Sequence, residues 1–241
     1  MFTGAEKPLG ISILRSRRRL RVSAKKSMVK DGYWYGLPLV LIAGGLMGLW
    51  LHHRSSFLLV LSLFFAILSF LVLNFFRDPE RAVPAEPHVI VSPADGLIVQ
   101  LAEEEFESRP VRRLSIFMSP LDVHVNRVPI AGSLTAIHYK KGSFRVASQD
   151  LASVENEQNV FTVEGEQGVV VVKQIAGLLA RRIVFWKRLG DSLARGERVG
   201  MIKFGSRVDV LVAPTVEWRV KVGDRVRAGS SILGTTPPPV D

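Results

Sequence analysis

The chain contains no cysteine among its 241 residues. This absence excludes disulfides, zinc–thiolate sites and a cysteine nucleophile. Histidine is also scarce, and the five histidines include no HxxxH or HExxH spacing, so we predict no metal site. Covalent chemistry in this chain therefore has to use serine, threonine, lysine or a carboxylate.

Acidic residues are too few to balance the basic ones, and the net charge is +10. The imbalance is concentrated at the start, where residues 1–30 hold nine Lys or Arg and a single Glu. A basic segment directly before an apolar run fits an anionic lipid surface better than a nucleic acid. No motif interleaves aromatic and basic residues for base stacking, so we predict no nucleic-acid partner.

Two apolar runs follow the basic segment: residues 37–51, LPLVLIAGGLMGLWL, and residues 57–76, FLLVLSLFFAILSFLVLNFF. The second run has no charge and is long enough to cross a hydrocarbon core of about 30 Å as a helix. Tyr33, Trp34 and Tyr35 precede the first run as an interfacial aromatic belt. We predict a transmembrane helical hairpin at residues 33–76 behind a basic N-terminal extension at residues 1–32.

Basic residues flank both outer ends of this hairpin, whereas the connecting loop has only Arg54. The positive-inside rule then predicts a cell-membrane protein with both termini, and the domain that follows, in the cytoplasm. The alternative is a cleaved signal peptide followed by one span, but no small-residue cleavage site follows the first run. Because Met28 is a second possible start, residues 1–27 are interpreted as an upstream extension.

The character of the sequence changes after Phe76, where a proline-punctuated linker leads into a β-rich domain at residues 77–241. No long amphipathic helical pattern occurs there, and residues 119–124 favour a short turn. Short apolar segments bounded by Gly, Pro and Asp predict strands. These segments are residues 88–92, 97–102, 111–118, 133–139, 159–164, 168–175, 180–186, 199–204 and 207–212.

One internal repeat relates residues 190–199 to residues 223–232 through the pattern G-D-x-apolar-x-x-G-x-x-apolar. Each unit reads as a Gly-Asp turn followed by a strand. Two such units predict a mostly β, barrel-sandwich-like domain similar to biotinyl and lipoyl carriers. PADGLIV at residues 93–99 and IAGSLTAI at residues 130–137 are candidates for further turn-strand units of this kind.

A Gly-Ser pair interrupts the strand pattern MIKFGSRVDVLV at residues 201–212. The simplest interpretation is a tight hairpin turn. Glycine also leaves its carbonyl sterically open and tolerates a strained backbone, which would allow Ser206 Oγ to attack the Gly205 carbonyl. Such an attack gives an ester, and elimination and hydrolysis then leave a pyruvoyl group. A pyruvoyl carbonyl captures amines and serves as an electron sink for decarboxylation.

Five motifs in order, FFRDPER, SPADG, FMSPLDVHVNR, QIAGLLARRI and GMIKFGSRVDV, resemble the short bacterial and archaeal form of phosphatidylserine decarboxylase. The resemblance runs from about Phe75 to Val212. It implies a membrane-associated proenzyme that cleaves itself between Gly205 and Ser206 into a β chain, residues 1–205, and an α chain, residues 206–241. Ser206 would become the covalent pyruvate cofactor. The enzyme would convert phosphatidylserine in the membrane to phosphatidylethanolamine through a Schiff base with the substrate amine.

The chain departs from the longer family members at one important position. In those members the self-cleavage triad uses a second histidine three residues after the first, and here that position is Arg127, which cannot serve as a base. His124 matches the first histidine, which the family associates with decarboxylation. We therefore take Ser206, His124 and Asp95 as the candidate catalytic residues. Asn156-Glu157 and Arg181-Arg182 share the resemblance, and one of the two arginines is a candidate for the lipid phosphate.

Other interpretations remain open at this point. Lys203 lies between the two repeat units, as the modified lysine of a biotinyl or lipoyl carrier does. A serine–lysine peptidase with Lys203 or Lys173 as base is a second alternative, although Lys203 and Ser206 would face opposite sides of a strand. An archaeal ether lipid, archaetidylserine, presents the same headgroup as phosphatidylserine. A homo-oligomer is also compatible with the sequence.

Overall fold

The structure is a computed structural model that describes residues 28–142, 156–177, 182–203 and 206–237. Within these ranges two helices, α1 (Lys30–His53) and α2 (Ser56–Phe75), precede a domain built from strands alone. The strands are β1 (Val89–Val91), β2 (Gly96–Phe106), β3 (Arg109–Met118), β4 (Val125–Arg127), β5 (Gly132–Lys140), β6 (Gln158–Gly165), β7 (Gly168–Ala176), β8 (Arg182–Phe185), β9 (Ser192–Leu193), β10 (Arg198–Lys203), β11 (Ser206–Val212), β12 (Glu217–Trp218), β13 (Arg225–Val226) and β14 (Ile232–Thr235).

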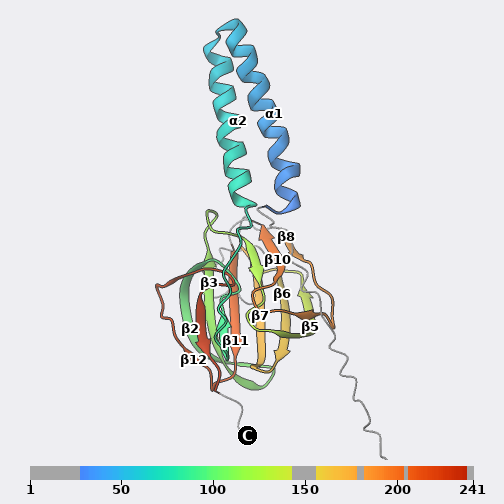
Figure 1. Ribbon diagram of the computed structural model, residues 1–241, viewed down its shortest axis with the longest axis vertical. Helices are drawn as coiled ribbons and strands as arrows, with labels where there is room; N and C mark the ends of the chain where they lie inside the picture. Colours follow the sequence, from blue (N-terminus) through green and yellow to red (C-terminus); the bar gives the residue numbers. More distant parts are fainter. Residues whose placement is uncertain (1–27, 143–155, 178–181, 204–205, 238–241) are drawn as a thin grey trace, which may run out of the picture.

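The two helices lie side by side as a hairpin that stands on one end of the β domain (Figure 1). Small residues let them approach closely, since a Cβ at Gly36 would come within 2.3 Å of a methyl carbon of Leu73. The hydroxyl of Ser62 in α2 donates a hydrogen bond to the Ala43 carbonyl of α1 at 2.9 Å. Close contact through glycine and serine is a typical way for helices to associate in lipid, where the hydrophobic effect does not drive them together.

The outer surface of the hairpin is strongly apolar, with Trp34, Phe57 and Phe70 each more than two-thirds exposed. Both helices are long and apolar enough to cross a membrane, and only 11% of each apolar window is buried within the protein. Apolar surface of this extent is uncommon on a protein surrounded by water, whereas lipid accommodates it. The predicted helical hairpin is therefore present, and its composition is consistent with membrane association.

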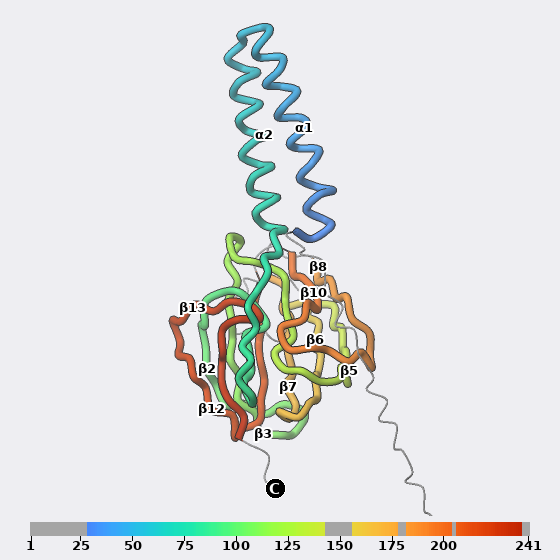
Figure 2. Tube along the Cα trace, in the orientation of Figure 1, coloured from blue at the N-terminus to red at the C-terminus, as the bar shows by residue number. Residues whose placement is uncertain are grey.

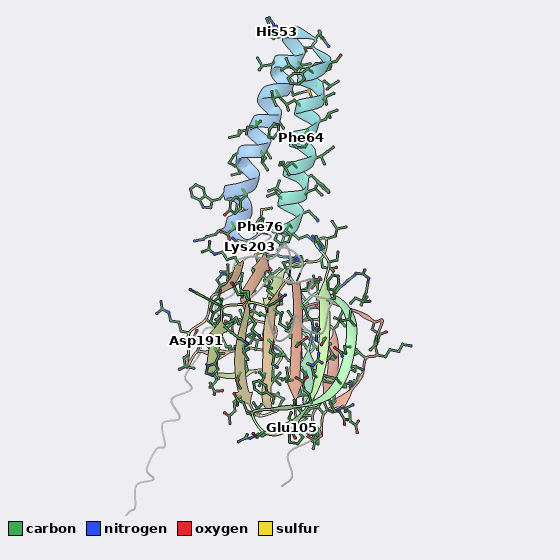
Figure 3. All side chains as sticks on the ribbon, turned by 180° about the vertical axis from the view of Figure 1, so that it is seen from behind. His53, Phe64, Phe76, Glu105, Asp191 and Lys203 are labelled. Atoms are coloured by element: carbon green, nitrogen blue, oxygen red, sulfur yellow. The ribbon has the colours of Figure 1, made fainter. Side chains whose placement is uncertain are left out.

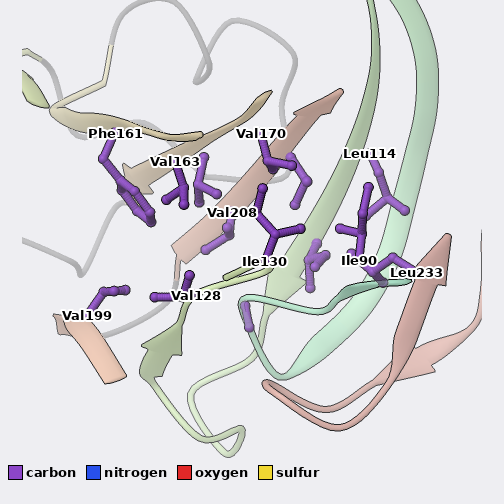
Figure 4. Packing of buried hydrophobic residues seen from close by; sticks show 14 of the residues in the cluster. Ile90, Leu114, Val128, Ile130, Phe161, Val163, Val170, Val199, Val208 and Leu233 are labelled. Atoms are coloured by element: carbon purple, nitrogen blue, oxygen red, sulfur yellow. The ribbon is translucent and has the colours of Figure 1, made fainter. Parts of the chain in front are cut away.

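The β domain is built around a curled sheet of eight strands in the order β13-β2-β3-β11-β7-β6-β5-β9. Two three-stranded sheets, β1-β14-β12 and β4-β10-β8, complete it. Buried aliphatic residues from these sheets meet in one core, where Phe161 and Val163 of β6 lie on the same side as Val208 of β11 (Figure 4). The predicted mostly β fold class is confirmed, and the expected strands between residues 88 and 212 occur with small shifts of their ends.

The internal repeat appears as two turns of the same geometry. Gly190 and Gly223 have φ angles of +86° and +95°, in the left-handed region that favours glycine. After them, the carboxylates of Asp191 and Asp224 each accept a backbone N–H from three residues earlier, both at 2.9 Å. The sequence pattern therefore predicted the turn correctly in both units.

Each repeat unit pairs with the start of a long strand. The Gly190 N–H donates to the Leu134 carbonyl at 2.8 Å, and the Gly223 N–H donates to the Ile98 carbonyl at 2.9 Å. Leu134 lies in β5 and Ile98 lies in β2, so β9 pairs with β5 as β13 pairs with β2. The PADGLIV and IAGSLTAI segments are the partners of the two repeat units, which gives the domain its internal symmetry.

The linker at residues 77–88 runs along the β domain from α2 to β1 (Figure 2). The carboxylate of Asp78 forms ion pairs with Arg127 Nη2 at 3.2 Å and with Arg198 Nε at 2.5 Å. Further along, Arg195 Nη2 donates to the Pro84 carbonyl at 2.6 Å. These bonds fix the linker to the domain, so the helices are held in one position at its end rather than on a free tether.

Two glycines of the repeat allow a matched test of this packing. Gly196 and Gly223 both have left-handed φ angles, +77° and +95°, but only at Gly196 would a Cβ meet a neighbour, Val83 Cγ2 at 2.5 Å. Gly223→Ala adds backbone strain of about 1–2 kcal/mol. Gly196→Ala adds the same strain and also a clash with the linker. We expect a larger drop in melting temperature for Gly196→Ala, measured by tryptophan fluorescence in detergent. An equal or smaller drop would show that the linker does not pack as described.

Candidate active site

Ser206 is the first residue of β11, a central strand of the eight-stranded sheet. It pairs with Met118 of β3 on one side and with Ala176 of β7 on the other, and it is completely buried. Its predicted cleavage partner, Gly205, lies outside the described residues. The candidate nucleophile is therefore held by ladders on both sides, directly after the peptide bond that it would attack.

The hydroxyl of Ser206 donates to the thioether sulfur of Met118, with Oγ and Sδ 3.3 Å apart. The same sulfur lies 3.8 Å from Nδ2 of Asn126. A thioether is a weak acceptor, so it neither activates the hydroxyl nor competes strongly for its proton. Within the described part of the chain, Ser206 Oγ forms no stronger hydrogen bond, which leaves it able to turn toward a base.

Three amide side chains form a buried chain beside Met118. Gln174 Nε2 donates to Asn126 Oδ1 at 2.8 Å, and Asn159 Nδ2 donates to Gln174 Oε1 at 2.9 Å. Gln174 pairs with Val208 of β11, which puts its side chain on the same face of the sheet as Ser206. Such a connected network holds each amide in one orientation. Sequence reasoning missed Gln174 and Asn159, and the available signal was a polar residue inside each of two apolar strands.

His124 lies directly before β4 and is completely buried. Its Nδ1 is 2.9 Å from the Asp122 carbonyl, which can only accept, so Nδ1 carries the proton. Its Nε2 is buried and has no hydrogen-bond partner among the described residues. Its own carbonyl accepts the Ile202 N–H at 3.4 Å, and Ser206 follows Ile202 by four positions. His124 is thus attached to the strand that leads to the cleavage site.

The ring of Phe75, the last residue of α2, packs on the His124 imidazole with the ring centroids 4.3 Å apart. The pKa of His124 is lowered from 6.5 to about 4, mainly by burial; the positive charge of Arg77 acts in the same direction, and Asp122 acts against it. At neutral pH His124 is uncharged, and the lone pair of Nε2 can accept a proton.

Asp95 has both carboxylate oxygens occupied. Arg81 Nη2 binds Oδ2 at 2.6 Å, and the Ala228 N–H donates to Oδ1 at 2.8 Å. Burial raises the pKa of Asp95, while Ala228 and Arg81 act in the opposite direction. These contacts give Asp95 a clear structural role, which joins the linker to the turn before β14. Its predicted catalytic role stays a prediction.

Comparison with known proteins identifies the family of the chain. Residues 68–234 match the family model described as phosphatidylserine decarboxylase. The chain belongs to the phosphatidylserine decarboxylase family.

Relatives named phosphatidylserine decarboxylase proenzyme cover most of the chain. One from Solibacter usitatus is 56% identical over 161 residues, which are 67% of this chain and 76% of the relative. One from Geotalea uraniireducens is 45% identical over 181 residues, 74% of this chain and 85% of the relative. One from Geobacter metallireducens is 42% identical over 210 residues, 86% of this chain and 95% of the relative.

Arg127, at the position of the second histidine in longer members of the phosphatidylserine decarboxylase family, is committed to the linker. Its Nη1 donates to the Gly196 carbonyl at 3.0 Å, and its Nη2 donates to the Pro79 carbonyl at 3.0 Å and to Asp78. A permanently charged guanidinium with these bonds has a structural function. That Arg127 does not act as the base stays a prediction.

The two lysines of the alternative interpretations are occupied elsewhere. Lys203 Nζ forms an ion pair with Asp31 at 2.8 Å, and its side chain is only 12% exposed, which does not suit a carrier lysine. Lys173 lies on the opposite face of the sheet from Ser206 and pairs with Glu104 at 3.7 Å. These contacts disfavour both the carrier and the serine–lysine dyad.

The residue after Ser206 anchors the strand on its other face. Arg207 Nε binds Asp209 Oδ1 at 2.6 Å, and Arg207 Nη2 donates to Ser115 Oγ at 2.8 Å, all within the protein. Removing one partner of such a buried ion pair is strongly destabilising, because the other charge is then left unpaired. The pair therefore holds the first residues of β11 in place. Two other motif residues, Arg181 and Phe204, lie outside the described residues. Arg182 is exposed on β8. Asn156 Nδ2 donates a hydrogen bond to the Ala176 carbonyl at 2.6 Å.

The contact between Phe75 and His124 predicts an unusual titration. In the wild-type chain His124 stays neutral until the pH falls to about 4, whereas the unfolded chain takes up the proton near 6.5, so folding loses stability as the pH falls through this window. Phe75→Ala admits water and raises the pKa of His124. Phe70→Ala, a change at an exposed residue of the same helix, leaves it unchanged.

Nuclear magnetic resonance of histidine-labelled full-length protein in detergent measures these pKa values. A wild-type His124 that titrates near 6.5, or the same pKa in Phe75→Ala as in wild type, contradicts the described packing.

Proposed function

We propose that this chain is a self-cleaving proenzyme that decarboxylates phosphatidylserine to phosphatidylethanolamine. The observation that carries the proposal is a buried serine at the start of a central strand, with a weak thioether partner, in a chain of the phosphatidylserine decarboxylase family. The neutral His124, whose Nε2 has no partner among the described residues, supports the same chemistry. The relatives named after phosphatidylserine favour that lipid over its ether analogue.

In the proposed self-cleavage, Ser206 Oγ bonds to the Gly205 carbonyl carbon, the peptide C–N bond breaks and an ester forms. Removal of the Cα proton of residue 206 then expels the Gly205 carboxylate and leaves dehydroalanine at the new amino terminus. Tautomerisation and attack of water release ammonia and leave the pyruvoyl carbonyl. Each step uses only the chain and water, so no external oxidant or reductant is needed.

The surroundings of residue 206 suit a small carbonyl group. Ser206 is fully buried, and Met118 and Ala176 flank it in the sheet. Its hydroxyl donates to the Met118 sulfur, and no lysine of the described residues forms a hydrogen bond with it. A pyruvoyl group at residue 206 would be held between Met118 and Ala176, and it would supply the amine-binding carbonyl and electron sink that decarboxylation needs. The amide chain through Asn126 supplies N–H donors close to this position.

His124 is proposed to move protons at Nε2. A neutral imidazole whose Nδ1–H is held by the Asp122 carbonyl presents a lone pair at Nε2 and can accept the proton of Ser206 Oγ. The same nitrogen can later return a proton to the substrate carbon after carbon dioxide has left. Asp95 stays a second candidate, acting through water, and its bonds to Arg81 and Ala228 support a positioning role.

After self-cleavage, the β chain and the α chain are proposed to stay associated. β11 begins at residue 206 and is paired along its length with β3 and β7, which belong to the β chain. Arg207 adds side-chain bonds across this boundary to Ser115. These interactions do not depend on the peptide bond between residues 205 and 206, so the α chain, residues 206–241, would remain in the sheet.

The hairpin is proposed to span the cell membrane, with the catalytic domain on the cytoplasmic side. The exposed apolar surface of α1 and α2 supports insertion. The excess of basic residues at the outer ends of the hairpin supports the cytoplasmic side. Fixed at the end of the hairpin, the domain could reach a headgroup without extracting the lipid from the bilayer.

Ser206→Ala tests the nucleophile. The variant should stay uncut and release no carbon dioxide, because no hydroxyl is available for the acyl shift. Ser192→Ala, at an exposed serine of β9, should be cut and active like wild type. Denaturing electrophoresis with intact-mass measurement identifies the fragment of residues 206–241, which in wild type lacks a free α-amine. Cutting of Ser206→Ala at this bond refutes the proposed role.

His124→Gln tests the proton acceptor. Glutamine keeps a polar side chain but has no basic nitrogen, so both self-cleavage and decarboxylation should slow by about a hundredfold or more. The control is His138→Gln at an exposed histidine of β5, which should change neither rate. Quenched time courses of cutting and carbon dioxide release measure the two rates. Wild-type rates in His124→Gln would remove His124 from the mechanism.

A further inference from the structure

A large groove lies where the helical hairpin meets the β domain. Its volume is about 1190 Å³, and its walls are the start of α1, the linker at residues 78–83, and parts of β8 and β10 with the loop before β10. Lys203, which lines it, is labelled beside Phe76 at the base of the hairpin (Figure 3). If the hairpin spans a membrane, this groove lies at the depth of the lipid headgroups.

The groove is cationic. Its lining includes eight Lys or Arg and four Asp or Glu. Most of these cations are already neutralised: Lys203 by Asp31 at 2.8 Å, and Arg198 by Asp78 at 2.5 Å. Lys187 is likewise paired with Glu197. These acidic residues of the groove therefore form ion pairs with Lys203, Arg198 and Lys187.

Arg182 and Lys30 are different. Both are exposed side chains in the groove lining, and neither has an ion pair or side-chain hydrogen bond within the described part of the chain. A guanidinium without a carboxylate partner can bind two phosphate oxygens at once, and an ammonium adds a second positive charge. The free cations of this groove therefore suit a phosphodiester.

Aromatic side chains give the groove the composition of a membrane interface. Tyr33 and Tyr35 at the start of α1 are 47% and 54% exposed, and Trp186 after β8 is 41% exposed. Tyrosine and tryptophan concentrate at the level where lipid headgroups meet the hydrocarbon. The combination of aromatic rings, free cations and adjacent apolar helices indicates a lipid rather than a soluble anion as the occupant.

The groove also lies close along the chain to the candidate active site. Arg182 of β8 is directly opposite Lys203 of β10 in the strand ladder. Lys203 precedes Ser206 by three positions. A headgroup whose phosphate rests on Arg182 is therefore placed next to the segment that leads into the reacting residue.

We propose that this groove binds the headgroup of phosphatidylserine while its acyl chains remain in the bilayer, with Arg182 and Lys30 as the phosphate-binding residues. This inference rests on the proposed function and adds the place where the substrate docks. It assigns the phosphate to Arg182, one of the two arginines that the sequence left open; Arg181 lies outside the described residues.

The same charges distinguish substrate from product. Phosphatidylserine has a net negative charge, since its phosphodiester and carboxylate outweigh its ammonium. In the reaction the carboxylate leaves as carbon dioxide and a proton takes its place on the carbon, so phosphatidylethanolamine has no net charge. A cationic groove therefore holds the substrate more tightly than the product and favours product release.

Kinetics in mixed micelles test the site with the full-length enzyme. Arg182→Gln should raise the KM, expressed as the surface mole fraction of phosphatidylserine, by about tenfold or more, because a charge-assisted phosphate contact is lost. Lys30→Gln should give a smaller rise. The matched control is Arg109→Gln, which should leave the KM unchanged. Arg109 is an exposed residue of the β2–β3 hairpin, at the end of the domain far from the helices, where Glu105 is labelled in Figure 3. A KM in Arg182→Gln equal to that in Arg109→Gln overturns the proposal.

A binding measurement separates this site from the decarboxylation itself. Phosphatidylglycerol is anionic but has no amine to react, and its retention by detergent-solubilised protein can be counted by native mass spectrometry. Arg182→Gln should retain less phosphatidylglycerol than Arg109→Gln, and wild type should retain more phosphatidylglycerol than phosphatidylethanolamine. Equal retention in either comparison overturns the lipid site, whether or not the protein releases carbon dioxide.

Discussion

The packing of Phe75 on His124 is the contact on which the rest of the molecule depends. It joins the last residue of α2 to the residue before β4, so the apolar hairpin and the β domain share one buried junction. The same ring removes water from the imidazole and keeps it neutral. Phe76, the next residue, packs on Tyr35 and lies near Lys203, which extends the junction to the groove. The end of the helical hairpin is in this sense a wall of the candidate active site.

Cleavage of the chain is compatible with this design because the strands that hold Ser206 do not need the bond before it. β11 is central in the sheet and is buried on both faces, by the aliphatic core on one and by the Arg207–Asp209 pair on the other. Cleavage before residue 206 would therefore leave the pairing of β11 with β3 and β7 in place. Burying an ion pair costs desolvation free energy, so the Arg207–Asp209 pair next to the candidate nucleophile suits a role in positioning the strand more than one in stabilising the fold.

Much of this architecture follows from sequence patterns. The long uncharged run predicted α2, and the two Gly-Asp units predicted turns whose backbone angles and side-chain bonds match. The site was harder, because its parts come from distant segments. The buried position of His124 depends on Phe75, and nothing in the sequence near either residue reveals that contact. In the sequence, Gln174 and Asn159 are single polar residues in separate apolar strands. Only the register of β6 and β7 shows that they lie opposite each other and form a hydrogen bond. Asp95 is the opposite case: the sequence motif predicted a catalytic role, and the structure shows two structural partners, Arg81 and Ala228.

The most direct test of the account is to trap the substrate on the working enzyme. Treating the full-length protein with cyanoborohydride during turnover of phosphatidylserine reduces the link between the substrate amine and its carbonyl partner, and peptide mass spectrometry then locates it. The account predicts a single adduct at the amino terminus of a fragment that begins at residue 206. An adduct at any other position, or carbon dioxide release by an uncut chain that still contains Ser206, would contradict it.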